Sequence, residues 1–265
     1  MEQISETVFG SPALISVLDF CKEDPVERVF LEDVTRRGLG RLVAVEAEGR
    51  IQGLCHIGAN IVPAGTGLAA LADVVAYGSP RMMVGQEQPV TELWDQVADS
   101  LPTPLDDRSG QPVFALEQPP SPGGSGLRRA TVDDLNSLVP ACAAAYREEV
   151  GIDAFERDPY LFRWRTRRQI ELGRSWLWLD HGSILFKAEA SAWTPSAVQL
   201  QQVWVDPLCR GQGIGRAAFA DLCCELLETT PRVCLFARPE NTAALALYEG
   251  TGMVRVAMYR SLIFP

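Results

Sequence analysis

The sequence predicts an α/β protein, in the broad sense that includes α+β folds, with two domains that each hold a mixed central sheet flanked by helices. Its 265 residues are long for one domain and comfortable for two. Residues 118–126 are rich in prolines and glycines, which disfavour the backbone hydrogen bonds of helices and of β-sheets. Beyond this segment the predicted order is strand, two helices, three strands, helix, strand, helix and strand, which a sheet-centred fold accommodates. We therefore expect a domain at residues 1–118, a linker at 119–126 and a second domain at 127–265.

The elements of the second domain follow from local signals. Thr131 precedes two acidic residues, as at a helix start, and apolar residues then recur at helical spacing up to Tyr146. Asp158 and Pro159 open another helix, which Gly173 breaks. The predicted elements in chain order are a strand at 127–130, helices at 131–146 and 158–172, strands at 176–179, 183–190 and 197–205, a helix at 214–227, a strand at 233–237, a helix at 242–249 and a bent or split strand at 254–264.

The first domain gives weaker signals. Strands are predicted at residues 42–45 and 51–57, followed by a segment at 58–65 whose glycines we assign to turns. Residues 82–94 are predicted to form a strand, a turn and a helix. A polar stretch at residues 102–111 is expected to be a surface loop.

Composition and charge narrow the classes of function. Hydrophobic residues make up 47% and charged residues 22%, as in a globular protein with a sizeable core, and no run approaches the roughly 18 apolar residues of a membrane helix. The first ten residues carry acids where a signal peptide carries bases, so we expect a cytoplasmic protein without a membrane partner. The net charge of −10 falls within residues 1–125 and makes nucleic acid a poor partner. This negative charge either keeps the protein soluble or attracts a cationic substrate or partner.

Cysteine and histidine usage argues against disulfides and metals. The seven cysteines form no CxxC pair, and an odd count without regular spacing does not fit a disulfide framework. Only two histidines are present, so we expect no metal site and assign the cysteines to the core. Among the 24 basic residues only Lys22 and Lys187 are lysines, which we attribute to genome composition.

The glycine-rich loop Arg210–Gly215 is the most informative segment of the chain. Pro207 ends the strand before it, because proline cannot donate a ladder hydrogen bond. Gly211, Gly213 and Gly215 permit positive φ and a close approach of the main chain to a ligand. The helix that follows begins with unpaired N–H groups and a partial positive charge. Together these features predict a cradle for an anion, above all a pyrophosphate.

Two other phosphate-binding patterns do not fit this loop. A Walker loop ends in Gly-Lys-Ser/Thr, whereas this loop continues with Arg216 and Ala217. A Rossmann loop opens a βαβ unit, has GxGxxG spacing and is followed by an acid about 20 residues later. Here the loop lies late in its domain, after a predicted hairpin. The pattern R/Q-x-x-G-x-G/A, after a strand that ends in V-x-P, fits throughout.

Residues 203–215 therefore resemble the cofactor signature of the GNAT superfamily of N-acetyltransferases. Residues 241–253 match a second motif of that family, N-x-x-A-x-x-L-Y-x-x-x-G-F, with Met253 in place of the aromatic residue. The two motifs occur in the family's order, and the expected elements flank them from Gly126 onward. The resemblance implies a GNAT fold for the second domain and acetyl-CoA as the cofactor.

The resemblance also implies roles for individual residues. A V-shaped opening is expected between the strand that ends at Val205 and the strand that begins at Val233, with the pantetheine and the acetyl carbonyl along the first strand. The amine attacks the thioester directly in this family, and Tyr248 matches the general acid that protonates the thiolate. The phenol has an ordinary pKa near 10, suited to a CoA thiol. The expected cofactor residues are Val203, Trp204, Val205, Arg210, Gly211, Gln212, Gly213, Ile214, Gly215, Arg216 and Asn241, the last of which also fits a helix N-cap.

The sequence departs from the family pattern at the general base. Several relatives carry a glutamate early on the strand before the loop, where this chain has Gln199. Glu189, Asp180 and His181 are other candidates, each with the alternative of a solvated hairpin residue. A chain of water molecules is a further alternative.

The first domain resembles, in residues 58–65 and 82–94, the domain DUF4081 that precedes a GNAT domain in a group of actinobacterial proteins. The resemblance implies a tandem of GNAT-like domains in which the first copy is degenerate and only the second keeps the cofactor loop.

Three hypotheses about function follow. The first is an acetyl-CoA-dependent N-acetyltransferase that acts on a primary amine of a small molecule or protein. The second is an acyl-CoA-binding or regulatory module with weak or no catalysis, motivated by Gln199. In the third, the acidic first half recruits a cationic protein substrate. The acceptor, the acyl-chain preference and the oligomeric state stay open.

Overall fold

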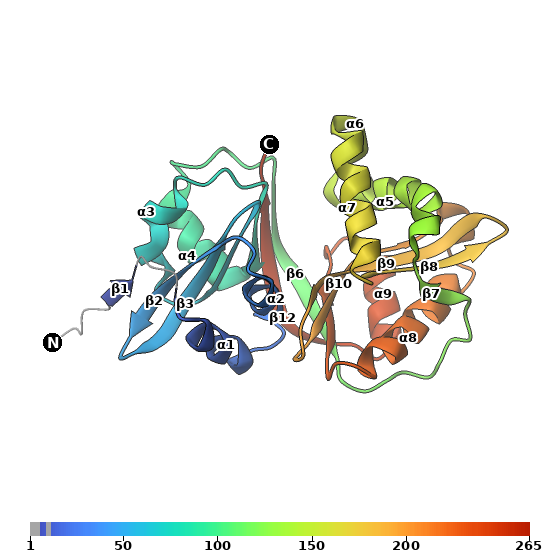
Figure 1. Cartoon of the computed structure of the whole chain (residues 1–265), viewed down its shortest axis with the longest axis horizontal. Coiled ribbons are helices and arrows are strands. Elements are labelled where there is room, and N and C mark those ends of the chain that lie inside the picture. The colour runs from blue at the N-terminus through green and yellow to red at the C-terminus, as the bar shows by residue number, and fades with distance from the viewer. Residues whose placement is uncertain (1–5, 9–11) are drawn as a thin grey trace. The chain divides into compact units, whose positions relative to one another are not determined.

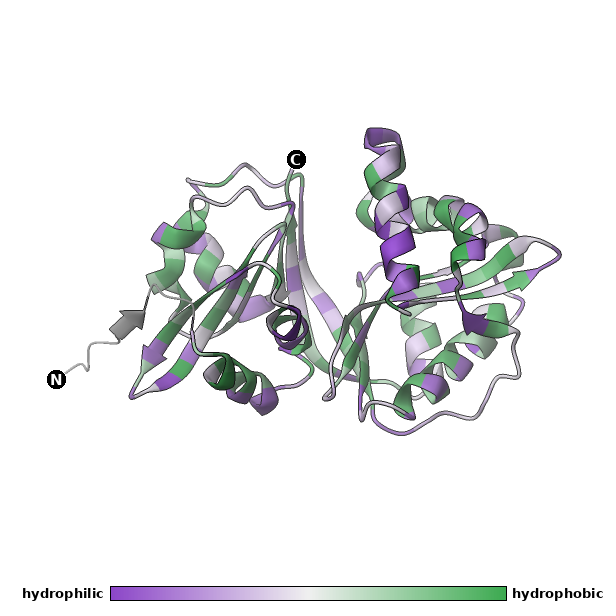
Figure 2. Ribbon diagram, viewed as in Figure 1, coloured by the Kyte–Doolittle hydropathy of each residue, from purple (hydrophilic) through white to green (hydrophobic). Residues whose placement is uncertain are grey.

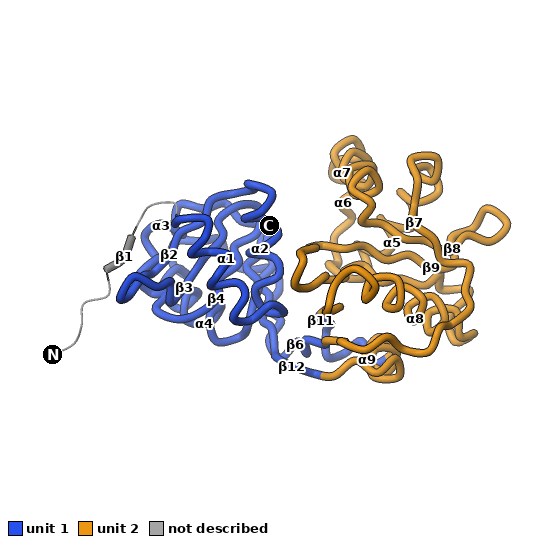
Figure 3. Tube along the Cα trace, turned by 60° about the horizontal axis from the view of Figure 1, so that its bottom comes forward, with its two compact units in different colours: residues 1–114, 236–242, 255–265 blue, residues 115–235, 243–254 orange. Residues whose placement is uncertain are grey.

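The computed structural model describes residues 6–8 and 12–265 (Figure 1). The chain forms two compact units that differ from the two sequence segments expected above (Figure 3). Unit 1 comprises residues 1–114, 236–242 and 255–265, and unit 2 comprises residues 115–235 and 243–254. Most of the C-terminal strand thus belongs to unit 1. The domain boundaries at 118, 126 and 127 describe chain segments rather than compact bodies and stay a prediction.

Unit 1 is built on a mixed sheet in the order β1-β2-β3-β4-β5-β12-β6. Strands β2 to β4 form an antiparallel meander, whereas β5 runs parallel to β4 and antiparallel to β12. Its elements are β1 (Glu6–Val8), α1 (Leu14–Glu23), α2 (Val29–Arg37), β2 (Arg41–Ala47), β3 (Arg50–Ile57), β4 (Asn60–Gly65), η1 (Leu68–Leu71), α3 (Ala72–Val75), β5 (Met82–Gln86), α4 (Glu87–Val97), β6 (Asp106–Leu116) and β12 (Val254–Ile263).

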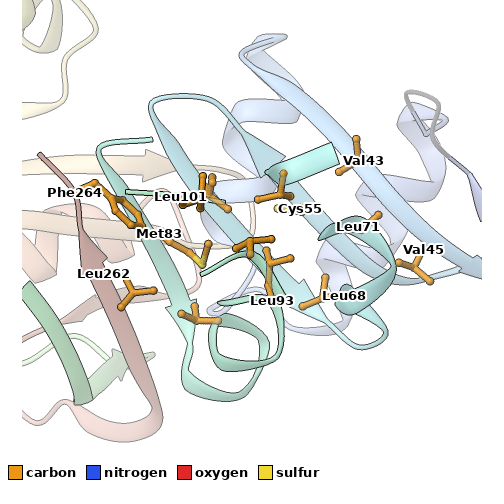
Figure 4. Close-up of a cluster of buried hydrophobic side chains, with 14 residues drawn as sticks. Val43, Val45, Cys55, Leu68, Leu71, Met83, Leu93, Leu101, Leu262 and Phe264 are labelled. Carbon is orange, nitrogen blue, oxygen red and sulfur yellow. The ribbon is translucent and has the colours of Figure 1, made fainter. Parts of the chain in front are cut away.

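Helices cover both faces of the unit 1 sheet because its central strands bury alternate residues on opposite sides. Val43, Ile61 and Met83 pack with Leu71 of η1 and Leu93 of α4 in one cluster (Figure 4). A second cluster joins the other face to α1 and α2; its buried members are Val17, Phe20, Cys21, Leu31, Ala44, Ile51, Leu54, Val62 and Ala64. Unit 1 therefore has three layers.

Unit 2 has the sheet order β11-β10-β9-β8-β7, with β11 parallel to β10 and the other neighbours antiparallel. One core cluster lies between this sheet and helices α5 and α7. Figure 2 shows α7 as predominantly hydrophilic, and only Thr166 and Ile170 of this helix are buried. The elements are β7 (Leu127–Arg129), η2 (Val132–Asp134), α5 (Leu135–Val150), α6 (Ala154–Arg157), α7 (Pro159–Glu171), β8 (Ser175–Asp180), β9 (Ser183–Trp193), β10 (Val198–Val205), η3 (Pro207–Cys209), α8 (Ile214–Leu227), β11 (Val233–Phe236) and α9 (Thr242–Gly250).

The prediction of a surface loop at residues 102–111 is wrong, because strand β6 begins at Asp106. The first part of β6 is largely exposed, which explains why its polar side chains resemble a loop. The C-terminal strand is one continuous element rather than a split one, and the short helix α6 is an addition to the prediction. The segment expected to be a linker has no regular structure, but the carboxylate of Asp221 accepts hydrogen bonds from the backbone amides of Gly123 and Ser125 at 2.7 and 2.6 Å.

The predicted helix start at Thr131 is confirmed as a capping box. Asp134 accepts from the backbone amide of Thr131 at 2.8 Å, and Arg128 makes a bidentate pair with the same carboxylate at 2.7 Å. The hydrogen bonds from Arg128, together with those from Thr131, lower the pKa of Asp134 to about 2 despite its burial. The carboxylate is thus firmly ionised at neutral pH.

Replacing Asp134 with Asn should lower the free energy of unfolding by about 2 kcal/mol at pH 7, as expected for a pKa depressed by nearly two units. Because the folded-state pKa is depressed, this stability is present above the ordinary carboxyl pKa near 4 and is lost as the pH falls towards 2. Urea unfolding at pH 7 and at pH 3 measures the difference. Asp133→Asn, at an exposed neighbour, is the control and should cost less than about 0.5 kcal/mol.

Candidate functional site

The two parallel strands β10 and β11 separate after a short paired stretch. Their register pairs Val198 with Val233 and Gln199 with Cys234. The rest of β10 continues beside β9, so its edge towards β11 has no strand partner beyond Gln199 in the register of this pair. This divergence is the arrangement expected for the V-shaped opening, and Val203, Trp204 and Val205 lie on the diverging part of β10.

A β-bulge changes the course of β10 within this diverging part. Gln201 pairs with Glu189 and Trp204 with Lys187, so β10 contains one residue more than β9 between these two pairs. Gln202 adopts a positive φ of 49°, an uncommon conformation for a residue other than glycine. The bulge lies directly before Val203, whose main chain, with that of Val205, is predicted to hold the pantetheine and the acetyl carbonyl.

A buried polar cluster supports the bulge from the neighbouring strand and helix. The ammonium group of Lys187 is fully buried and donates to Glu189 Oε1 at 2.7 Å and to Gln202 Oε1 at 2.8 Å. It also lies 3.2 Å from the sulfur of Cys142 on α5. The amide of Gln201 donates to the other oxygen of Glu189 at 3.4 Å. Two strands and a helix are thereby joined where β10 changes register.

Lys187 and Glu189 form an ion pair in the charged state. Burial alone lowers the pKa of Lys187, but the neighbouring Cys142 and Glu189 raise it above its ordinary value. Burial likewise raises the pKa of Glu189, and the ammonium of Lys187 reverses the shift, so the carboxyl pKa lies below its ordinary value. Glu189 is therefore a weak base, and its Oε1 already accepts a hydrogen bond from the ammonium group of Lys187.

The glycine-rich loop leads into the N-terminus of α8. Ala217 donates the first helical hydrogen bond, to the carbonyl of Gly213 at 3.0 Å. The amides of Ile214, Gly215 and Arg216 precede it and have no acceptor within the helix. Gly211 and Gly213 have φ of 75° and 82°, and a Cβ at either would meet nothing within 4 Å. The main chain is thus open on this side, as a bound pyrophosphate requires.

Three elements meet at Gly215. A Cβ there would lie 3.0 Å from Val205 Cγ2 at the end of β10 and 3.9 Å from Leu247 Cδ2 on α9. The contact with Val205 is tighter than most Cβ contacts in proteins, so a side chain here would require Val205 to shift, which favours glycine at this position. The loop, the diverging strand and the helix that carries Tyr248 therefore lie side by side in unit 2.

Arg210 is anchored by a carboxylate from α5. Its Nη2 donates to Glu148 Oε2 at 2.7 Å, and its Nε donates to the carbonyl of Val205 at 3.1 Å. The indole of Trp204 donates to Glu148 Oε1 at 3.0 Å. Trp204 is buried, so its side chain packs in the core while its main chain remains on the strand that faces the opening. Gln212 folds back on the loop through a bond to the carbonyl of Leu208 at 3.1 Å.

Tyr248 lies in the interior of unit 2. Its ring packs against Phe219 of α8 with 5.2 Å between the centroids, and the residue is 6% exposed. Burial, with smaller contributions from Glu149 and Cys223, raises the pKa of the phenol well above its ordinary value. The hydroxyl therefore keeps its proton throughout the neutral range, as a proton donor must.

The backbone after Tyr248 explains the glycine of the second motif. The carbonyl of Tyr248 accepts hydrogen bonds from the amides of Thr251 and Met253, both at 3.1 Å, and Gly252 between them has φ of 95°. Glycine adopts that conformation without strain. Asn241 stands directly before α9, and its backbone amide donates to the carbonyl of Arg238 at 3.1 Å. Its role at the cofactor stays a prediction.

The candidate bases occupy different environments. The side-chain amide of Gln199 donates to the hydroxyl of Ser191 at 3.0 Å, and the same hydroxyl donates to the backbone carbonyl of Gln199 at 3.1 Å, so this residue links β10 to β9. Asp180 and His181 lie at the β8–β9 turn, with side chains 58% and 96% exposed. Glu189 is engaged by Lys187. The described residues thus offer none of the expected candidates as a free carboxylate beside the bulge.

Sequence reasoning missed the buried cluster around Lys187. One signal was available, because a lysine within the apolar segment 184–188 is unusual in a chain with only two lysines. Buried lysines are rare unless they are paired. Its partners were not predictable, since they come from residues on two strands and a distant helix.

Comparison with known proteins finds a family match in each half of the chain. Residues 139–253 match the model of the acetyltransferase (GNAT) family, and residues 40–138 match a domain of unknown function, DUF4081. The chain resembles a mycothiol acetyltransferase of Beutenbergia cavernae, with 29% identity over 66% of the chain and 59% of the relative. It also resembles a mycothiol acetyltransferase of Salinispora tropica, with 27% identity over 81% of the chain and 78% of the relative. The chain thus spans about 59% of the length of the first of these relatives.

Solved structures show the same fold. A GNAT-like protein from Streptococcus suis aligns with a TM-score of 0.59, at 15% identity, over 97% of this chain and all of that one. A tandem GNAT protein of the clavulanic acid biosynthesis pathway aligns with a TM-score of 0.55, at 11% identity, over 94% of each chain. The predicted fold class, two GNAT-like halves with mixed sheets, is confirmed.

The fold is that of the GNAT acetyltransferases, tandem GNAT proteins included. Residues 139–253 are similar to the GNAT acetyltransferases, a family of enzymes, and residues 40–138 are similar to the DUF4081 domain. Both sequence resemblances are therefore confirmed. No helix among residues 6–8 and 12–265 has the length and apolar character to cross a membrane.

Proposed function

We propose that the protein is an N-acetyltransferase that transfers an acetyl group from acetyl-CoA directly to a primary amine of a small molecule or protein. The observation that carries the proposal is the meeting of three elements at Gly215: the diverging strand β10, the N-terminus of α8 and the helix of Tyr248. The match of residues 139–253 to the GNAT family supports the reaction class. Bound acetyl-CoA would supply the activated thioester.

The residues of unit 2 fit the cofactor by their chemistry. First-turn amides of α8 and the positive-φ glycines offer donors and a partial positive charge to a pyrophosphate. The unpaired edge of β10 offers main-chain groups to the pantetheine and the acyl carbonyl. Arg210, Gln212 and Arg216 surround this cradle with polar side chains, and all three are exposed. We keep Asn241 as a cofactor contact on the resemblance alone.

Tyr248 is the proposed proton donor to the departing thiolate. Its raised pKa keeps the phenol protonated, and its ring packs on Phe219 of α8, the helix that begins at the glycine-rich loop. A positioned general acid typically contributes roughly 10²–10⁴-fold in rate. The acceptor amine loses its proton to water in this account, because the described candidate carboxylates are paired or remote.

The acceptor is the open part of the proposal. The relatives named mycothiol acetyltransferase make mycothiol formation the first place to look for the amine. The second candidate function, an acyl-CoA-binding module with little catalysis, rests on Gln199 and the paired Glu189. Release of CoA that depends on an added amine distinguishes the two, since a binding module would retain acetyl-CoA without releasing CoA. A panel of amino sugars, polyamines, amino acids and peptides supplies the amines.

Replacing Gly213 with Asp should weaken acetyl-CoA binding by about 100-fold, or about 2.7 kcal/mol. The substitution adds a negative charge where the pyrophosphate would lie and places a side chain at a φ of 82°. Isothermal titration with acetyl-CoA measures the loss.

Gly182→Asp provides the matched control, because Gly182 has the same φ of 82° and open surroundings, but lies in the β8–β9 turn. It should bind acetyl-CoA within about twofold of the wild type. Equal affinities for the two variants would show that the loop does not hold the cofactor.

A further inference from the structure

A small cavity in unit 1 is lined by residues that have no assigned role in acetyl transfer. It opens between the α1–α2 junction and strands β5, β6 and β12, with a volume of about 120 Å³. That is far more than the roughly 10–15 Å³ needed by one water molecule, so a small organic group fits. Its polar lining comes from Asp24, Glu27, Gln86 and Tyr259.

Glu27 is the unusual member of this lining. Its side chain is 8% exposed, and its Oε1 has no hydrogen-bond partner among residues 6–8 and 12–265. A buried carboxylate oxygen without a hydrogen-bond donor is costly, because burial removes hydration that nothing replaces at that atom. The structure therefore contains an acceptor that lacks a donor in a residue that lines a cavity.

The nearest cation does not meet that need. Arg28 Nε lies 3.7 Å from Glu27 Oε2, beyond good hydrogen-bond distance. The guanidinium instead lies 3.6 Å above the ring of Phe20 and donates to Glu23 at 3.0 Å. Arg28 therefore forms an ion pair with Glu27 through Oε2 and leaves Oε1 without a donor among the described residues.

The surroundings of Glu27 are fixed before any ligand binds. Asp24 Oδ1 accepts from the amide of Glu27 at 3.0 Å, and the hydroxyl of Tyr259 donates to the carbonyl of Glu27 at 3.1 Å. Tyr259 pairs with Gln86 across β12 and β5 and packs on Phe236 with 5.1 Å between the centroids. Ligand binding would therefore cost little free energy for ordering these residues.

The remaining walls of the cavity are aliphatic. Val26, Val113 and Val256 line it beside the two carboxylates. No cluster of three His, Cys, Asp or Glu residues that could hold a metal ion exists in the part of the chain that the structure describes. A charged head next to methyl groups instead suits an alkylammonium ion.

We propose that this cavity binds the ammonium group of a small primary amine, with Glu27 and Asp24 as its anionic partners and the valines against its first methylene groups. The site rests on unit 1 alone and does not depend on the acetyl transfer proposed for unit 2. It gives the first half of the chain a function of its own, recognition of the amine class that the proposed reaction consumes.

The protonation of Glu27 provides a signature of binding. Burial raises the pKa of Glu27 to about 7, with Arg28 lowering it and Asp24 raising it. The carboxyl is therefore about half protonated at pH 7, and a bound ammonium favours the ionised form. Binding should release about half a proton at pH 7 and should strengthen between pH 6 and pH 8.

The experiment is an NMR titration of the full-length protein with n-propylammonium chloride at pH 7.5, with potassium chloride added to equalise the ionic strength. Backbone amides of Glu27, Gln86 and Tyr259 should shift with saturation, and the Glu27 side-chain carboxyl carbon should titrate at lower pH when the amine is bound. 1-Propanol has the same alkyl group without charge and should cause no saturable shift.

Two variants complete the experiment. Glu27→Gln keeps the shape and removes the charge, and should weaken binding at least tenfold. Glu23→Gln removes a neighbouring carboxylate that is 65% exposed, and should bind the amine as the wild type does. Equal binding by Glu27→Gln, equal binding of 1-propanol, or absence of saturation would overturn the proposal. None of these readouts requires acetyl-CoA, so the result is independent of the transferase activity.

Discussion

Lys187→Met is expected to lower the free energy of unfolding by about 3–5 kcal/mol, because it leaves the Glu189 carboxylate buried without its cation. The loss should be largest in unit 2, which holds every tryptophan except Trp94. Urea unfolding followed by tryptophan fluorescence therefore reports it.

Removing both charges tests the cause of that loss. The double variant Lys187→Met with Glu189→Leu should regain most of the stability, since buried ion pairs replaced by apolar residues of similar size are often neutral. Lys22→Met, at the chain's other lysine, removes an exposed pair with Asp19 whose side chains are 62% and 63% exposed. It should cost less than about 1 kcal/mol. A similar small loss for Lys187→Met would mean that the ammonium is not buried with Glu189.

The same cluster connects stability to the proposed site. Lys187 holds the side chain of Gln202, whose backbone has positive φ within the bulge. In the double variant, the hydrogen bond from Lys187 to the side chain of Gln202 is absent, although no unpaired charge is left in the cluster. We expect acetyl-CoA binding to weaken there, and a further Gln202→Gly substitution to restore part of it, because glycine favours positive φ without a clamp.

Tyr248→Phe should lower kcat by about 100-fold on a good amine substrate and leave the acetyl-CoA KM within about twofold. The ring stays packed on Phe219, so folding should be nearly unchanged. Steady-state rates across a pH series measure both constants. Tyr146→Phe removes a half-buried phenol of α5 that packs edge-on against Phe162, and should retain the wild-type rate.

The pH series adds a second check on Tyr248. Because burial raises its pKa, the acid form persists above the ordinary value near 10, and the wild-type rate should show no fall from this group between pH 7 and pH 9. A full wild-type rate in Tyr248→Phe would remove the phenol from the mechanism.

Local sequence signals predicted the parts of the site that depend on neighbouring residues. Pro207, the glycines and the helix start lie within ten residues, so their geometry follows from backbone preferences alone. The Thr131 cap is equally local. These features were predictable because no distant partner decides them.

Features that depend on register were not predictable. The bulge at Gln202 arises from the pairing of β10 with β9, and Cys142 reaches Lys187 from a helix far back in the chain. The pairing of Arg260 on β12 with Gly85 on β5 places most of the C-terminal strand in unit 1. Such contacts join residues that are distant in sequence, and the alternation of apolar residues does not specify the partner strand.

The most direct test of the proposed reaction is the initial rate at which the full-length protein releases CoA thiol from acetyl-CoA, with and without the amine panel. The account predicts release that depends on an amine, a product acetylated on nitrogen by mass spectrometry, and a rate that Gly213→Asp reduces while Gly182→Asp does not. Release that no amine accelerates, or an equal rate in the two glycine variants, would contradict acetyl transfer at the Arg210–Gly215 loop.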